Sequence, residues 1–184
     1  MSLSSIHLHD SCSVQRAEGR SLAFFCKRKP VRVDRELVSE LKRVASEFNG
    51  KNVRLCLHEG PEASFHDMVI VEHQGGYYRP HKHLEKGESF HILEGSMAVF
   101  VFDEQGQVID ACVLEAQDNF LYRIDTDMYH AVMPLSDRVV YHESKPGPFT
   151  GAGDSVFPAW APEGHDPDEV RGYTDVLRST LKGA

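Results

Sequence analysis

The feature that most constrains the fold is a run of short, strand-like segments that fills residues 53–144. These segments are rich in β-branched and aromatic residues, and turn-forming residues separate them at close intervals. The stretch "DEQGQ" at 103–107 is typical of a hairpin turn. Many short strands without intervening helices predict an antiparallel β-sandwich or barrel.

The N-terminal part of the chain has a different pattern. Residues 1–32 show no clear period, and we expect them to be irregular. Residues 34–50 predict a helix that Asp34 caps at its start and that Asn49-Gly50 ends. Its apolar residues fall on one face, which predicts that the helix packs against the strands.

The C-terminal part begins with a stretch rich in proline and glycine after residue 145, which predicts an ordered loop. Residues 168–182 then predict a last, short helix. We therefore expect three parts: an N-terminal segment with one helix packed on a barrel (1–52), the barrel itself (53–150), and a tail with the C-terminal helix (151–184).

Composition excludes several classes of partner. The net charge of −8, without a block of lysine or arginine, argues against nucleic acid and anionic membranes. The longest early apolar run, "LAFF" at 22–25, is too short for a signal peptide or a membrane span. Four widely spaced cysteines without a CxxC pair favour reduced thiols over a disulfide framework. We expect a cytoplasmic protein.

Residues 75–95, "GGYYRPHKHLEKGESFHILEG", hold the candidate metal ligands. On a strand, residues two apart face the same side, so "HKH" directs His81 and His83 into one space. "LEKG" predicts a turn that brings Glu88 opposite them, and His130 on a later strand is the candidate fourth ligand. Imidazole and carboxylate suit a divalent ion such as Fe²⁺, Mn²⁺, Zn²⁺ or Ni²⁺. The alternative is that HxH lies on a solvated strand face.

The spacing of this stretch matches the first cupin motif, G-x5-H-x-H-x3,4-E-x6-G, at every specified position from Gly75 to Gly95. The second cupin motif is poorly kept. His130 is present, but other residues stand where the family usually has Gly, Pro, Gly and Asn, namely Asn119, Asp125, Asp127 and Pro134.

Three longer stretches resemble the WbuC family of cupin-fold metalloproteins: "YYRPHKHLEKGESFHILEGSMAVFVFDEQGQV", "VVYHESKPGPF" and "FPAWAPEG". The resemblance covers roughly residues 53–163. It implies an antiparallel double-stranded β-helix, the cupin or jelly-roll barrel, with a metal held by the equivalents of His81, His83, Glu88 and His130. Members are often encoded among genes for surface polysaccharide synthesis. The resemblance supplies a fold and a metal, but no substrate.

Strand parity extends the expected site. Tyr77 and Arg79 share the parity of His81, and the Arg79 guanidinium would bind a carboxylate or phosphate or, alternatively, orient Glu88. Phe90 and Ile92 share a face with Glu88, whereas His91 should point away. A second set, Arg54, Cys56 and His58, lies on one face of its strand, and the sequence does not decide whether that face is inward. We take Arg79, Tyr77 and His58 as candidate catalytic residues.

Three functions fit these observations. The first is a metal-dependent isomerase or epimerase that acts on a sugar or sugar nucleotide in surface polysaccharide synthesis. The second is an iron(II)-dependent dioxygenase, and the third is a non-catalytic protein that binds a small ligand through its metal. In each case we expect a small anionic or sugar-like ligand. We also expect a homodimer, because the cupin barrels that this chain resembles are commonly dimers, and its N-terminal segment and strand-rich body offer edges for pairing. The alternative is that residues 1–50 cover the barrel of a monomer.

Overall fold

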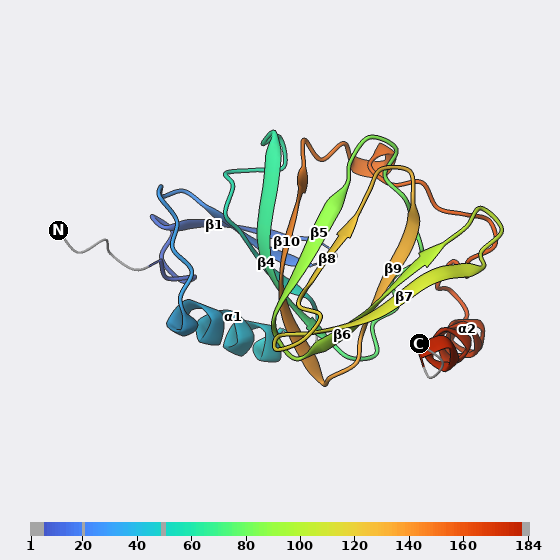
Figure 1. The fold of residues 1–184 in the computed structure, drawn as a ribbon. Coiled ribbons are helices and arrows are strands. Elements are labelled where there is room, and N and C mark those ends of the chain that lie inside the picture. The colour runs from blue at the N-terminus through green and yellow to red at the C-terminus, as the bar shows by residue number, and fades with distance from the viewer. Residues whose placement is uncertain (1–5, 20, 49–50, 182–184) are drawn as a thin grey trace.

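The computed structural model describes residues 6–19, 21–48 and 51–181. The chain folds into two facing β-sheets with a helix at each end, the mainly β jelly roll that the sequence predicts (Figure 1). The strands are β1 (Val14–Glu18), β2 (Leu22–Cys26), β3 (Val53–Cys56), β4 (Phe65–His73), β5 (Glu88–Glu94), β6 (Ser96–Phe102), β7 (Val108–Glu115), β8 (Leu121–Ile124), β9 (Tyr129–Pro134) and β10 (Arg138–Pro146). The helices are α1 (Arg35–Glu47), the 3-10 turn η1 (Gly151–Gly153) and α2 (Pro167–Thr180).

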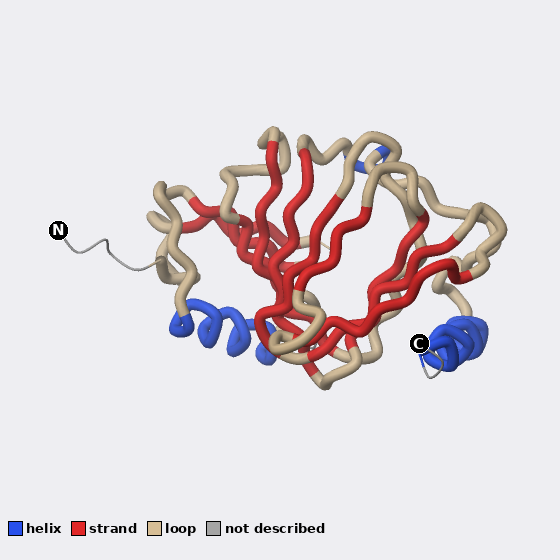
Figure 2. The backbone as a smooth tube through the Cα atoms, in the orientation of Figure 1, coloured by secondary structure: helices blue, strands red, loops and turns tan. Residues whose placement is uncertain are grey.

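The larger sheet has the strand order β1-β2-β3-β4-β10-β5-β8, and the smaller one has the order β7-β6-β9. Figure 2 shows the two groups of strands meeting at one end and spreading apart at the other. Apolar residues from both sheets pack between them, among them Phe90 and Ile92 of β5, Met97 and Val99 of β6, and Tyr141 of β10. Because successive side chains of a strand point to opposite faces, every central strand turns one face toward the space between the sheets.

The expectation that residues 1–32 are irregular is wrong, because β1 and β2 extend the larger sheet. β2 carries the apolar run "LAFF" and pairs with β3, Leu22 opposite Val53 and Phe24 opposite Leu55. This pair is parallel, so the sheet is mixed rather than purely antiparallel. A parallel pair needs a long connection, and α1 provides it by crossing from β2 to β3.

Both helices cover outer faces of the sheets. The Asp34 side chain caps α1 by accepting from Leu37 N, and Leu41 and Ala45 pack on the outside of the larger sheet. The predicted stop at Asn49-Gly50 lies outside the described residues, as does residue 182 of the last predicted helix. α2 packs Leu177 against the outer face of the smaller sheet, beside Phe100.

Two turns confirm the glycines expected from the pattern. Gly106 ends the "DEQGQ" hairpin between β6 and β7 with φ 85°, and Gly95 joins β5 to β6 with φ 81°. A Cβ atom at Gly95 would lie 2.5 Å from the Arg138 carbonyl oxygen, so no larger residue fits there without movement. Within the described residues, no helix is long and apolar enough to cross a membrane.

Candidate metal centre

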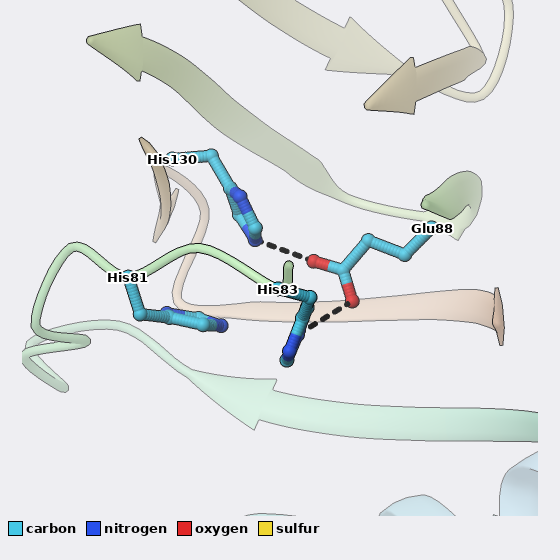
Figure 3. Close-up of side chains that lie close together, drawn as sticks. All are labelled: His81, His83, Glu88 and His130. Carbon is cyan, nitrogen blue, oxygen red and sulfur yellow. Dashed lines mark ion pairs between the residues drawn. The ribbon is translucent and has the colours of Figure 1, made fainter. Parts of the chain in front are cut away.

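Four side chains converge between the sheets: His81, His83 and Glu88 from one reversal of the chain, and His130 from the later strand β9. One ligand atom from each lies within 4.8 Å of the others, and Figure 3 shows the imidazoles and the carboxylate turned toward one another. Glu88 Oε1 lies 2.5 Å from His130 Nε2, and Oε2 lies 3.6 Å from His83 Nε2. The sequence therefore placed these four residues together, and the cluster could hold a metal ion.

Backbone pairing, rather than a full strand, positions the HKH segment. His81 N donates to His130 O at 3.0 Å, and His130 N donates to His81 O at 2.9 Å. This isolated bridge attaches the segment to β9. Glu88 is the first residue of β5, so the "LEKG" reversal brings it back to the two histidines that precede it.

A backbone carbonyl holds the outer ring nitrogen of each histidine. His81 Nδ1 lies 3.2 Å from Arg79 O, His83 Nδ1 lies 2.5 Å from Asp154 O, and His130 Nδ1 lies 2.9 Å from Met128 O. Because a carbonyl only accepts hydrogen bonds, it keeps the proton on Nδ1 and leaves a lone pair on Nε2. Metal-binding histidines are commonly oriented in this way.

The electrostatics also suit a cation. Although burial works against its charged form, Lys145 and the neighbouring histidines hold the pKa of Glu88 well below its usual range. Burial, together with His130, lowers the pKa of His81 to about 4, so this ring is neutral at pH 7. The Nε2 atoms of His83 and His130 are buried beside the Glu88 carboxylate, but neither makes a hydrogen bond of suitable geometry with any described residue. A divalent ion would satisfy these atoms, and the donor set fits one.

The loop that carries the poorly kept second motif has one residue with a positive φ. Asp127 stands where the family usually has glycine, and it adopts φ 60°, a conformation that aspartate tolerates better than most residues. Its amide donates to His83 O at 2.7 Å, and its carboxylate lies 2.8 Å from Lys82 Nζ. Asp127 therefore attaches the loop before His130 to the HKH segment.

We expect Asp127→Val to destabilise the fold by about 1–3 kcal/mol, because a β-branched side chain is strained at positive φ. Asp127→Gly should stay within about 1 kcal/mol of the parent, since it relieves the backbone while losing an exposed ion pair. Urea unfolding of both variants measures the difference. Equal stabilities would show that the backbone conformation at this position contributes little.

A cavity of about 270 Å³ opens beside the cluster. Its wall includes three of the four cluster residues, His81, Glu88 and His130. The other lining residues are Ser21, Asn52, Arg54, Ile70, Glu72, Tyr78, Phe90, Val132, Tyr141, Glu143 and Lys145. Lys145 Nζ lies 3.2 Å from Glu88 Oε2 and 3.0 Å from Glu143 Oε1, which links the cluster to the rest of the wall.

The expectation that Tyr77 and Arg79 share this cavity is wrong. Residues 76–80 are not in a strand, so the alternation counted back from His81 fails before Pro80. Tyr77 instead donates to Pro162 O at 2.8 Å. Arg79 donates to Pro158 O at 2.9 Å and lies 3.8 Å from Glu163. Both side chains support the C-terminal tail, and Tyr78 lines the cavity in their place.

The set Arg54, Cys56 and His58 divides into three environments. Arg54 lines the cavity, and Cys56 is 1% exposed in the apolar core between the sheets. His58 lies beyond the end of β3, stacked on His66 at a ring distance of 4.3 Å, and does not line the cavity. His91 points away from the cavity toward Phe120, as its parity predicts.

Sequence reasoning missed Glu72, which is 4% exposed in the cavity wall. Tyr141 OH donates to its Oε1 at 2.8 Å, and Asn52 Nδ2 lies 3.4 Å from the same atom. Its Oε2 is buried without a hydrogen-bond partner among the described residues. Burial raises the pKa of Glu72 to about 7. The sequence could have indicated this, because Glu72 is two residues from Ile70 on β4 and therefore points to the same, inward side of the strand.

Comparisons with known proteins give partial matches only. A family model described as a domain of unknown function, DUF6016, matches residues 33–114. No curated protein sequence matches the chain. Among solved structures, similarity extends to cupin-fold proteins. One is the capsular polysaccharide assembling protein CapF from Staphylococcus aureus, with 17% identity and a TM-score of 0.49. That match covers 57% of this chain and 29% of CapF.

Two further structures show similarity at the same level. L-ribose isomerase from Cellulomonas parahominis, solved with L-psicose, has 19% identity and a TM-score of 0.47 over 60% of this chain and 70% of its own. Oxalate decarboxylase from Lactobacillus farciminis has 16% identity and a TM-score of 0.41, over 51% of this chain and 26% of its own. Similarities this partial do not transfer a ligand or an activity.

Proposed function

We propose that the protein binds a divalent metal ion through His81, His83, Glu88 and His130 and uses it to act on a small sugar-like ligand, as an isomerase or epimerase. The observation that carries the metal assignment is the shared orientation of the three imidazoles. Each is held at Nδ1 by a carbonyl, and their Nε2 atoms lie in the cluster with Glu88. A bound ion would supply a Lewis acid for a carbonyl or hydroxyl group.

The cavity provides the other elements that such a reaction needs. Glu72 has a pKa of about 7 through burial, so it can hold or release a proton near neutral pH. Tyr78 and Tyr141 bring hydroxyl groups to the same wall, and Phe90 and Val132 contribute apolar surface. This combination of apolar wall and a few polar groups is typical of small-molecule sites.

The test begins with elemental analysis of protein purified without a histidine tag, and we expect close to one divalent ion per chain. Metal-loaded protein is then incubated in D₂O with a panel of aldoses and ketoses, and NMR records isomer formation and deuterium incorporation at carbon. We expect turnover of at least one sugar. A metal-loaded protein that binds sugars without exchange or isomerisation would contradict the enzymatic part of the proposal.

The donor set also supports a second function, an iron(II)-dependent dioxygenase. Three imidazoles and one carboxylate beside an open cavity suit iron(II). Oxygen consumption by the iron(II)-loaded protein in the presence of a ligand separates this function from the first. Isomerisation without oxygen uptake favours the first proposal, and substrate-dependent oxygen uptake favours the second.

A further inference from the structure

Arg54 is a cation of the cavity wall that no acidic side chain among the described residues balances. It extends from β3, opposite Ile70 of β4, which in turn pairs with Tyr141 of β10. All three residues line the cavity, so Arg54 lies on the face of the sheet that points inward. Arg54 forms no hydrogen bond or ion pair with any residue that the structure describes, and its Nε atom is buried.

The acidic groups of the same wall are already engaged. Glu143 lies 3.0 Å from Lys145, and Glu88 belongs to the metal cluster and also contacts Lys145. Glu72 accepts from Tyr141, and burial raises its pKa, whereas a guanidinium paired with this carboxyl would lower it. No acidic group of the described wall is therefore left to balance the charge of Arg54, which favours a group from outside the chain.

An unpaired guanidinium in a partly enclosed site favours an anionic ligand. Its planar fork of donors matches a carboxylate or a phosphate in a bidentate arrangement. The other cation of the wall, Lys145, lies beside two carboxylates, whereas Arg54 has no carboxylate partner among the described residues. Arg54 is half-buried, and a charge that is partly removed from water without such a partner is costly, which favours recruitment of an anion.

We propose that Arg54 binds the carboxylate or phosphate group of a small ligand that occupies the cavity beside the metal cluster. The location of the ligand's other end, at the cluster, rests on the proposed function, but the assignment of Arg54 does not. The volume of about 270 Å³ lies just below the range of about 300–1,000 Å³ typical of small-molecule pockets. The ligand class is thus an acid or phosphate of monosaccharide size, and a whole sugar nucleotide would extend beyond the cavity.

The test compares the full chain with Arg54→Gln, Arg54→Lys and the matched control Arg79→Gln, which alters a half-buried arginine outside the cavity. Calorimetry measures the affinity for two probes, inorganic phosphate and acetate, with metal-loaded and with chelator-treated protein. Elemental analysis and thermal unfolding monitor the metal and the fold. We expect Arg54→Gln to weaken binding of the preferred anion by roughly tenfold to a hundredfold, with unchanged metal content.

Arg54→Lys should give an intermediate loss, because lysine keeps the charge but lacks the fork, and Arg79→Gln should bind like the parent. The preferred probe identifies the group as phosphate or carboxylate. Unchanged affinity in a folded Arg54→Gln variant, or no binding of either probe by the parent, would overturn the proposal. If the parent contains no metal but binds the anion, and Arg54→Gln weakens that binding, the result would support this proposal and contradict the metal centre.

Discussion

Replacement of both histidines of the HKH segment, His81→Ala with His83→Ala, is expected to abolish stoichiometric metal binding. Two of the four ligands are lost, and the remaining pair, Glu88 and His130, offers one carboxylate and one imidazole. Mutation of groups that merely orient ligands typically costs about 10–100-fold in affinity, so removal of two ligands should cost considerably more. Elemental analysis after dialysis should show close to one ion in the parent and almost none in the variant.

The control is His91→Ala with His142→Ala, which removes as many imidazoles from the outer face of the larger sheet. These two residues pair across β5 and β10, away from the cavity. This control should keep its metal. Chelation should also destabilise the parent by about 3 kcal/mol if the ion was present at a hundred times its dissociation constant, and should leave the His81/His83 variant unchanged. Full metal content in that variant would refute the assignment of the ligands.

The cluster was predictable because motif spacing and strand pairing both act over short distances. His81, His83 and Glu88 lie within one reversal of the chain, and a divergent second motif still marked His130. At the divergent position 127 the backbone has φ 60°, a conformation that glycine adopts readily and that aspartate tolerates. A glycine in a sequence motif can therefore mark a backbone conformation that another residue type, here aspartate, can also adopt.

The predictions that failed depended on extrapolating a local rule. The parity of His81 was extended to Tyr77 and Arg79, but the chain before Pro80 is not a strand, and the two side chains turn to the C-terminal tail. Residues 1–32 were expected to be irregular because two five-residue strands are too short to show a period. Their pairing with distant residues 53–56 comes from tertiary structure, which a local pattern does not contain.

The residues of the cavity wall outside the metal cluster are likewise brought together by tertiary structure. Arg54, Glu72 and Tyr141 belong to three different strands, and only their register across the sheet brings them to one cavity. The sequence did not decide which face of β3 points toward the cavity, because residues on both faces of this strand are largely buried. The orientation of Arg54 was therefore undecided. Tertiary burial, not the sequence pattern, therefore decides which charged residues face a ligand.

The second large effect should come from Glu72→Gln, which we expect to make the protein relatively more stable as the pH rises. Burial raises the pKa of Glu72 to about 7, against a usual value of 4.5, so the folded state holds this proton more tightly than the unfolded state. The stability due to the bound proton is fully present below pH 4.5 and is lost as the pH rises through about 7. The loss amounts to about 3 kcal/mol between these limits.

A glutamine at position 72 does not titrate, so it avoids this loss while it can still accept from Tyr141 OH. Urea unfolding at pH 5 and pH 8.5, with chelator present throughout, gives the difference in unfolding free energy between Glu72→Gln and the parent. That difference should shift in favour of the variant by about 3 kcal/mol on going to the higher pH. The exposed Glu115→Gln should show no such shift. Parallel pH profiles for Glu72→Gln and the parent would mean that the Glu72 carboxyl ionises normally, and its role as a proton carrier near neutral pH would fall with it.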